Sequence, residues 1–122
     1  MAVAPNGKNV YAVGYTSNSI VTYDRDATGA LTKQGAIKDS TDLNGAIGVA
    51  VAPDGKNVYA VASNSDTIVT YDRDAAGTLT KQVFIIDSTD LDYPLGVAVA
   101  PDGKNVYAVA AFSDSIITWD RL

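Results

Sequence analysis

Short apolar segments separated by polar turns run along the whole chain, and none has the spacing of an amphipathic helix. In the middle of the chain these segments are Gly48–Ala52, Val58–Ala62, Thr67–Tyr71 and Thr78–Ile86. They are rich in β-branched and aromatic residues, which favour strands. Pro-Asp-Gly at 53–55 is typical of a tight turn, and polar residues separate the later segments. The pattern predicts four strands joined by hairpins.

The pattern is repeated. VAPNGKNVYAV begins at Val3, and VAPDGKNVYAV begins at Val51 and again at Val99, so the period is 48 residues. Four hairpin-connected strands recurring at this length predict an all-β fold of β-propeller blades, in one domain spanning 1–122 with repeats 1–48, 49–96 and 97–122. The chain then starts inside a first strand, and its third blade is incomplete because it lacks a fourth strand. A parallel β-solenoid is the alternative, but tight hairpin turns do not suit parallel stacking.

The second repeat, VAPDGKNVYAVASNSDTIVTYDRDAAGTLT, resembles the repeats of lactonase-like seven-bladed β-propellers, the phosphogluconolactonase superfamily, and of the related YVTN-type surface-protein propellers. The resemblance covers the whole chain and concerns residues that build blades. It implies a propeller fold and makes lactone hydrolysis one activity to consider. It assigns no catalytic residue, because the basic and His residues of a lactonase-type site have no counterpart located in this sequence.

Composition excludes several kinds of chemistry. The chain has 122 residues, a net charge of −5 and no run of Lys or Arg, so we expect no nucleic-acid partner. No segment has the roughly 20 apolar residues of a membrane span, and Met1 leads directly into strand-like sequence, so we expect a soluble chain with neither membrane partner nor signal peptide. Without Cys or His there are no disulfides, no zinc sites of the usual kind and no His-based catalysis. The cellular compartment stays open.

Candidate ligand-binding residues lie on one rim of the expected ring. In a propeller, the turns between second and third strands share a rim with the connections between blades. This rim would display carboxylates beside amide and aromatic side chains, namely Asp42, Asp90, Asp92, Tyr15, Asn64, Tyr93 and Phe112. Such a set could hold a cation or a sugar, although solvated loop acids are the simpler interpretation. Calcium is a candidate cofactor because Asp72-x-Asp74-x-x-Gly77 matches the start of a calcium loop, but this is also an ordinary turn sequence, and we predict no metal ligand.

The unfinished third blade predicts contacts with another copy. Ser115–Trp119 would be an unpaired edge strand, a template for pairing with a second chain. The third repeat is also more apolar here, with Ile117 and Trp119 in place of Val69 and Tyr71. We therefore predict an oligomer interface at Ile116, Ile117 and Trp119, and head-to-tail closure of two or more copies into a ring.

Two functions follow from these expectations. The first is a non-enzymatic propeller module that assembles with itself into a closed ring and acts as a scaffold or ligand-binding platform. The alternative is a lactonase-like hydrolase that acts on a cyclic ester at the channel mouth. A third hypothesis is that the chain is a fragment whose only property is to assemble, without binding a ligand. The ligand itself is not identified by the sequence.

Overall fold

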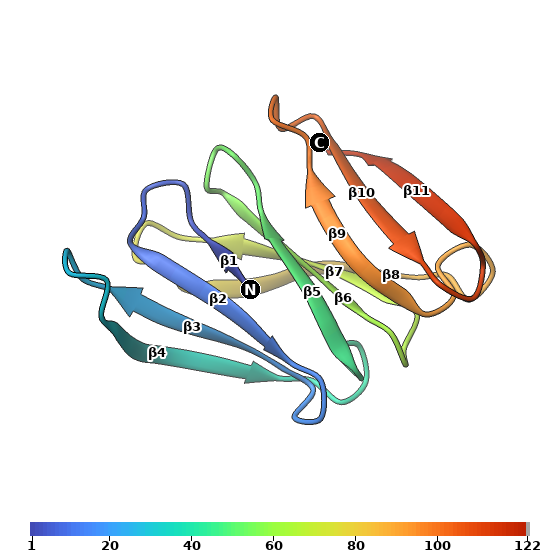
Figure 1. The fold of residues 1–122 in the computed structure, drawn as a ribbon, viewed down its shortest axis with the longest axis horizontal. Helices are drawn as coiled ribbons and strands as arrows, with labels where there is room; N and C mark the ends of the chain where they lie inside the picture. The colour runs from blue at the N-terminus through green and yellow to red at the C-terminus, as the bar shows by residue number, and fades with distance from the viewer. Residues whose placement is uncertain (122) are drawn as a thin grey trace.

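Each repeat forms one antiparallel sheet in the computed structural model, which describes residues 1–121 (Figure 1). The first sheet contains β1 (Ala2–Val3), β2 (Asn9–Gly14), β3 (Ser19–Arg25) and β4 (Leu31–Lys38). The second contains β5 (Ala46–Val51), β6 (Asn57–Ala62), β7 (Thr67–Arg73) and β8 (Leu79–Ile86). The third contains β9 (Pro94–Val99), β10 (Asn105–Ala110) and β11 (Ser115–Asp120). The strands within each sheet follow sequence order, so the predicted all-β blade architecture is confirmed.

The predicted strands of the second repeat lie within two residues of the observed ones. β5 begins earlier than expected, because Ala46 pairs with Ala62 across a bulge. β7 continues to Arg73, because Asp72 pairs with Asn57 on one side and Arg73 pairs with Leu79 on the other. The ladder thus extends through polar residues that the hydrophobic pattern assigned to turns.

The third sheet ends at β11. Over the described residues, β11 pairs with β10 on one side and with no strand on the other. In the second sheet the corresponding position beside β7 is occupied by β8. Within residues 1–121 the third sheet thus has three strands, as the sequence predicts, and β11 lies at its edge.

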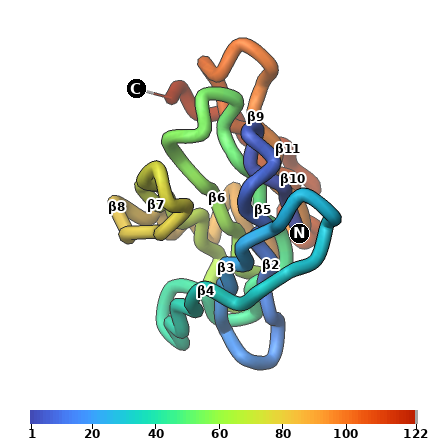
Figure 2. The backbone as a smooth tube through the Cα atoms, turned by 90° about the vertical axis from the view of Figure 1, so that its left-hand side faces the viewer, coloured from blue at the N-terminus to red at the C-terminus, as the bar shows by residue number. Residues whose placement is uncertain are grey.

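The hydrophobic core lies between the sheets. One cluster joins the first and second sheets and is centred on Tyr11, Ile20, Val58 and Tyr71. A second cluster joins the second and third sheets through Tyr59, Val61, Ile68, Val106 and Ala108. Figure 2 looks along the row of sheets, with the first sheet nearest the viewer. β6 and β7 thus contribute side chains to both clusters, one from each face of the middle sheet, as in a repeat array whose units share their cores.

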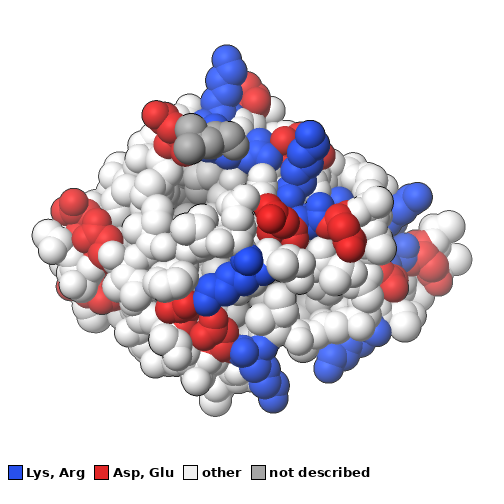
Figure 3. Space-filling view, turned by 180° about the vertical axis from the view of Figure 1, so that it is seen from behind, with Lys and Arg blue, Asp and Glu red and all other residues white. Residues whose placement is uncertain are grey.

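The turns gather at two edges of the array. The β2–β3, β6–β7 and β10–β11 turns lie at the same edge as the β4–β5 and β8–β9 connections, at the lower side of Figure 1. We call this edge the rim. None of the described residues belongs to a helix that could cross a membrane. Figure 3 shows acidic and basic side chains interspersed on the rear face, without a continuous basic surface.

Candidate ligand-binding rim

Four side chains from three blades meet on the rim, and we call them the rim cluster: Tyr15, Asn64, Tyr93 and Phe112. Tyr15 lies in the β2–β3 turn, Asn64 in the β6–β7 turn and Phe112 in the β10–β11 turn. Tyr93 comes from the β8–β9 connection. Because one turn recurs every 48 residues, the repeat places these side chains side by side.

The rim cluster is joined by hydrogen bonds and stacking. The hydroxyl of Tyr15 donates to Oδ1 of Asn64 (3.2 Å), and the hydroxyl oxygens of Tyr15 and Tyr93 lie 3.4 Å apart. The rings of Tyr93 and Phe112 stack, with centroids 4.5 Å apart and planes inclined by 19°. Tyr15 is 43% exposed and Phe112 is 68% exposed. The result is an exposed aromatic face with adjacent hydroxyl and amide groups, suited to a polar ring such as a sugar.

Tyr93 adopts a backbone conformation that bulky residues rarely occupy. Its φ is 59°, and the equivalent residue of the preceding repeat is Gly45, with φ 73°. A Cβ at Gly45 would lie 2.8 Å from Nδ2 of Asn64 and 3.0 Å from Oγ of Ser63. The third repeat has Phe112 and Ala111 at those two positions. A bulky residue at positive φ costs about 1–3 kcal/mol, and such residues cluster at functional sites.

The two phenols of the rim cluster influence each other. The hydrogen bond with Tyr93, followed by those with Ser63 and Asn64, lowers the pKa of Tyr15. The bond with Tyr15 raises the pKa of Tyr93. The shared bond explains both directions, because the neutral phenol donates to the one that ionises. Ionisation of one phenol is therefore linked to the hydrogen bond that the other donates to it.

Asp42 is not displayed on the rim, and that expectation needs correction. The residue is 5% exposed, and its carboxylate bonds Nζ of Lys81 on β8. Lys81 also pairs with Oδ2 of Asp39 at 2.9 Å. The hydrogen bonds that Lys81 donates to the carboxylates of Asp42 and Asp39 raise the pKa of Lys81. For Asp39, burial acts to raise the pKa, but hydrogen bonds from the Asp42 amide and from Lys81 outweigh it, so the pKa is lowered. Asp42 thus joins the first and second blades.

Asp90 and Asp92 lie on the rim connection but outside the rim cluster's hydrogen-bond network. Asp90 is exposed, and its backbone carbonyl accepts a bond from Ser113 Oγ at 2.8 Å. Asp92 is half-buried, and its carbonyl accepts the amide of Phe112 at 3.1 Å. Both residues therefore hold the connection against the β10–β11 turn. Their role in ligand binding stays a prediction.

The acidic turns considered for calcium are closed by their own hydrogen bonds. Oδ1 of Asp74 accepts the amides of Ala76 and Thr78 at 3.0 and 2.9 Å. Oδ1 of Asp72 accepts side-chain amides from Asn57 and Gln82. Among residues 1–121, no three carboxylates gather as a metal ion would require. The geometry therefore fits a structural turn better than a calcium loop.

The predicted interface residues of β11 do not share one face. Ile117 and Trp119 pack toward the second sheet, against the core that contains Tyr59 and Ile68. Ile116 points to the opposite side and is 68% exposed. Their role in contacts between copies remains a prediction, and it would involve two separate surfaces.

The hydrophobic pattern does not predict the arginine that connects neighbouring blades. Nε of Arg73 donates to the Tyr11 hydroxyl (2.7 Å), and its Nη2 donates to Oδ1 of Asn9 (2.8 Å). Arg121 reaches back in the same way to Asp54 and Asn57, at 2.7 and 2.8 Å. Arginine recurs at positions 25, 73 and 121, and lysine recurs at 33 and 81. This recurrence is the sequence signal that points to contacts between blades. Arg73, Lys81 and Arg121 thus join their blades to the preceding ones.

Comparison with known proteins identifies the fold family. The family model described as lactonase, 7-bladed beta-propeller, matches residues 1–121. A candidate 6-phosphogluconolactonase from Bacteroides uniformis superposes with a TM-score of 0.89 and 26% identity, over 98% of this chain and 35% of that one. A protein from Lactobacillus plantarum gives 0.87 and 26%, over 98% and 36%. The periplasmic gluconolactonase of Pseudomonas aeruginosa gives 0.85 and 18%, over 98% and 34%, and shows the fold alone.

The chain spans about one third of the length of these solved structures. None of the curated proteins matches it. The match of the family model over nearly all of its length, together with the blades and their shared cores, shows that the chain belongs to the family of lactonase-type seven-bladed β-propellers.

Proposed function

We propose that this chain acts in a lactonase-like propeller on a cyclic sugar ester that binds at the rim cluster. The strained, stacked Tyr93 carries the proposal. The preceding repeat has glycine at this position, so the array does not need an aromatic residue there. The aromatic face that Tyr93 forms with Phe112 has the chemistry of a sugar-binding surface. Family membership and the 6-phosphogluconolactonase name of the Bacteroides uniformis neighbour favour a lactone as the ligand.

The rim cluster would stabilise charge during hydrolysis. Water attacks the ester carbonyl carbon, the bond from that carbon to the ring oxygen breaks, and the ring oxygen receives a proton. Negative charge develops on the carbonyl oxygen in between. The hydroxyl of Tyr93, a phenol that is protonated at neutral pH, is a donor available to that oxygen. The amide of Asn64 and the hydroxyl of Tyr15 would orient the sugar hydroxyls.

The test compares the chain with a variant that restores the second repeat's residues. Tyr93→Gly/Phe112→Asn recreates the Gly45 and Asn64 pair, which this backbone already accommodates. We expect δ-gluconolactone to bind the original chain and to lose at least about tenfold in affinity in the variant, because a stacking face and a hydroxyl donor are removed. Calorimetry measures the binding, and a pH-stat measures hydrolysis above the spontaneous rate.

Phe84→Asn is the matched control, since Phe84 is a similarly exposed aromatic residue on β8, away from the rim cluster. Its affinity for the lactone should be unchanged. The proposal is contradicted if the lactone does not bind the original chain, or if it binds Tyr93→Gly/Phe112→Asn as tightly as the original chain. Binding without hydrolysis would support the rim as a ligand platform and reject the enzymatic part.

A second candidate, a non-enzymatic ring scaffold, is favoured by the two outer flanks of the array. The first sheet exposes Arg25 and Leu31, the counterparts of Arg73 and Leu79, which are engaged between blades. The third sheet exposes Asp102 and Ile116, the counterparts of Asp54, which binds Arg121, and of the buried Ile68. One flank therefore carries the donors and the other the acceptors of a blade-to-blade contact, as head-to-tail assembly requires.

A further inference from the structure

The first repeat differs from the other two at one position of an otherwise identical turn. The β1–β2 turn contains Ala-Pro-Asn-Gly-Lys, whereas the β5–β6 and β9–β10 turns contain Ala-Pro-Asp-Gly-Lys. Asn6 therefore stands where the later repeats have Asp54 and Asp102, and a glycine follows it. The backbone nitrogen of a glycine attacks the preceding side-chain amide readily, because glycine has no Cβ to hinder the approach. The turn thus contains a group that can change chemically without an enzyme.

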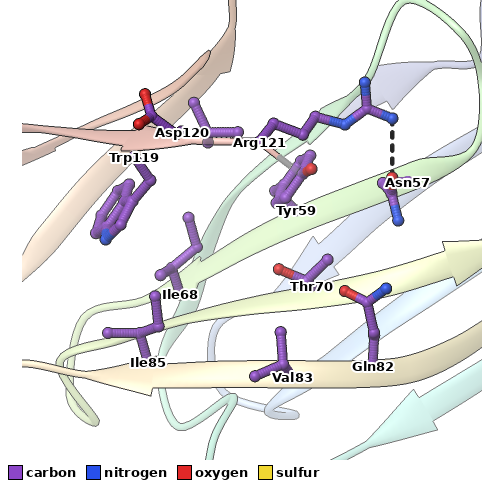
Figure 4. A pocket seen from close by; sticks show the side chains of 11 residues that line it. Asn57, Tyr59, Ile68, Thr70, Gln82, Val83, Ile85, Trp119, Asp120 and Arg121 are labelled. Carbon is purple, nitrogen blue, oxygen red and sulfur yellow. Dashed lines mark hydrogen bonds between the residues drawn. The ribbon is translucent and has the colours of Figure 1, made fainter. Parts of the chain in front are cut away.

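In the second repeat, the aspartate of this turn joins two blades. Nη2 of Arg121 donates to Oδ2 and Oδ1 of Asp54 at 2.7 and 2.8 Å. The same nitrogen donates to Oδ1 of Asn57 at 2.8 Å, and Figure 4 shows the arginine side chain extending past Tyr59 toward Asn57. Burial acts to raise the pKa of Asp54, but the Lys56 amide and Arg121 outweigh it, so the pKa is lowered. The carboxylate is therefore the form that this contact stabilises.

Asn6 makes a weaker, neutral version of the same contact. Nη2 of Arg73, the counterpart of Arg121, lies 3.5 Å from Oδ1 of Asn6 and binds Oδ1 of Asn9 more closely, at 2.8 Å. Arg73 is already fixed in place, because its Nη1 donates to the carbonyl of Gly55 at 3.0 Å. A carboxylate at position 6 would therefore lie within ion-pair distance of Arg73 without movement of the backbone.

Two donors hold the side-chain carbonyl of Asn6. The Lys8 amide donates to its Oδ1 at 3.0 Å, and Nη2 of Arg73 approaches the same oxygen. The Gly7 amide donates to the Ala4 carbonyl in the resting turn and must leave it to react. When the Gly7 nitrogen attacks Cγ of Asn6, negative charge develops on Oδ1, where both donors lie. The bond from Cγ to the side-chain nitrogen then breaks. That nitrogen leaves as ammonia with the proton of the Gly7 amide, and a five-membered imide ring remains.

The same donors influence how water opens the imide. Attack on Cγ breaks its bond to the Gly7 nitrogen and leaves an ordinary aspartate at position 6. Attack on the main-chain carbonyl carbon breaks the other bond to that nitrogen and leaves isoaspartate, which lengthens the backbone of the turn. Within residues 1–121 no group donates to the main-chain carbonyl of Asn6, whereas the oxygen on Cγ has the Lys8 amide and Arg73 beside it. The charge of the hydrolysis step is thus better stabilised on the side that gives aspartate.

We propose that Asn6 is a site of spontaneous deamidation, and that its product in the folded chain is aspartate, which completes an ion pair with Arg73. The reaction consumes one water and releases ammonia. The first repeat then acquires the residue that the second and third repeats already have at this position. The neutral contact between the first and second blades thereby becomes a charged one, like the contact of Arg121 with Asp54.

The other Asn-Gly pair of the chain provides an internal control. Asn44 precedes Gly45 in the β4–β5 connection. Gly45 is buried, and its amide donates to Oδ1 of Asn18 at 3.0 Å. Oδ1 of Asn44 accepts only a long bond from the uncharged Nδ2 of Asn64, at 3.4 Å. Asn44 has no cationic donor comparable with Arg73 among the described residues, so we expect it to react more slowly.

Peptide mass spectrometry of aged protein measures both pairs in one sample. The folded chain is kept for several weeks in mildly alkaline buffer, and trypsin then separates residues 1–8 from residues 39–56. We expect Asn6 to deamidate at least about tenfold faster than Asn44. Electron-transfer fragmentation distinguishes aspartate from isoaspartate. Aspartate should be the main product in the folded chain, and isoaspartate should dominate in the free peptide MAVAPNGK, which lacks Arg73.

Substitutions test the ion pair itself. Asn6→Asp installs the product, and its Tm should exceed that of the original chain by about 2–4 °C, as for a partly exposed ion pair. The same substitution should give no gain in an Arg73→Gln background. Asp54→Asn is the matched reverse change, because it places an Asn-Gly pair beside Arg121 in the same kind of turn. This variant should start with a lower Tm, deamidate at position 54 about as fast as at Asn6, and regain the lost Tm as it ages.

The proposal is overturned if Asn6 and Asn44 react at the same rate in the folded chain, or if isoaspartate is the main product there. It is also overturned if Asn6→Asp leaves the Tm unchanged, or raises it equally in the Arg73→Gln background. If Arg73→Gln does not fold, Asp54→Asn decides, and the absence of deamidation at position 54 contradicts the assignment. The rim cluster takes no part in this chemistry, so the lactone proposal and this one can fail separately.

Discussion

At the scale of single residues, Tyr71 shows that the fold tolerates the free-energy cost of burying a hydroxyl group without a hydrogen-bond partner. Its hydroxyl is buried and forms no hydrogen bond with any residue of 1–121. Burial, followed by the nearby charges of Asp39 and Asp42, raises the pKa of this phenol strongly. Tyr71→Phe removes the unsatisfied group and keeps the ring, so we expect the free energy of unfolding to rise by about 1 kcal/mol. Urea unfolding followed by circular dichroism measures it, and a loss of similar size would show that the hydroxyl has a partner.

Single residues also show where the sequence was informative. The repeat alone predicts that Tyr15, Asn64 and Phe112 lie on one rim, because they occupy equivalent turns of successive blades. The positive φ of Tyr93 and its stacking were not predictable, because strand periodicity says nothing about the backbone inside a connection. Asp42 was assigned to the rim surface wrongly, since its partner Lys81 comes from the next blade and is remote in sequence.

At the scale of strands, Lys81 is the contact by which β8 holds the connection of the preceding blade. Lys81→Met leaves Asp42 buried without its cation, so we expect a loss of about 2–3 kcal/mol in the free energy of unfolding, somewhat less than for a fully buried pair because Lys81 is partly exposed. Lys33→Met is the matched control, because Lys33 occupies the same position on β4 and forms no ion pair among the described residues. It should change stability by less than about 0.5 kcal/mol. Equal effects of the two substitutions would contradict the assignment.

The same contact predicts how stability depends on pH. The pKa of Asp39 is lowered in the folded chain, so its contribution is present above the unfolded value of about 4 and is lost as the pH falls through the folded value. Thermal unfolding between pH 6 and pH 3 should therefore show a decline in Tm that begins near pH 4. In Lys81→Met the decline should be shallower, because one of the interactions that lowers the Asp39 pKa is gone. An identical decline in both proteins would assign the acid sensitivity to other carboxylates.

Strand positions were the most predictable feature of this chain. Alternation and turn residues located the strands of the second repeat to within two residues. The arginine contacts between blades are not predicted by the local sequence, because Asp72-Arg73-Asp74 has the composition of a turn. Only the spacing of Arg73 relative to Arg25 and Arg121 identifies it as part of an interface.

At the scale of the whole molecule, the two flanks predict the mode of assembly if the chain closes into a ring. Arg25 of one copy should engage Asp102 of the next, as Arg121 engages Asp54 within the chain. We expect light scattering on a size-exclusion peak to give a multiple of 12.7 kDa that resists dilution. Arg25→Glu should weaken association at least about tenfold, because like charges then meet at a desolvated contact.

The compensating change provides the control for that experiment. Arg25→Glu/Asp102→Arg reverses both charges and should recover association, whereas Lys56→Glu, on the middle blade, should not affect it. A monomer at all concentrations would exclude assembly through these flanks. It would leave the lactone proposal untouched, since the rim cluster lies within one chain.

The position of the two cores between the sheets has a consequence for how such a chain could arise. The unit that recurs in the sequence is a blade, but the unit that excludes water is the contact between one blade and the next. Duplicating one 48-residue stretch of a gene therefore adds a finished contact each time, because donor and acceptor are copied together. An ancestral duplication would have needed no new chemistry to be tolerated, and later divergence, as at Gly45 and Tyr93, could then be confined to the rim.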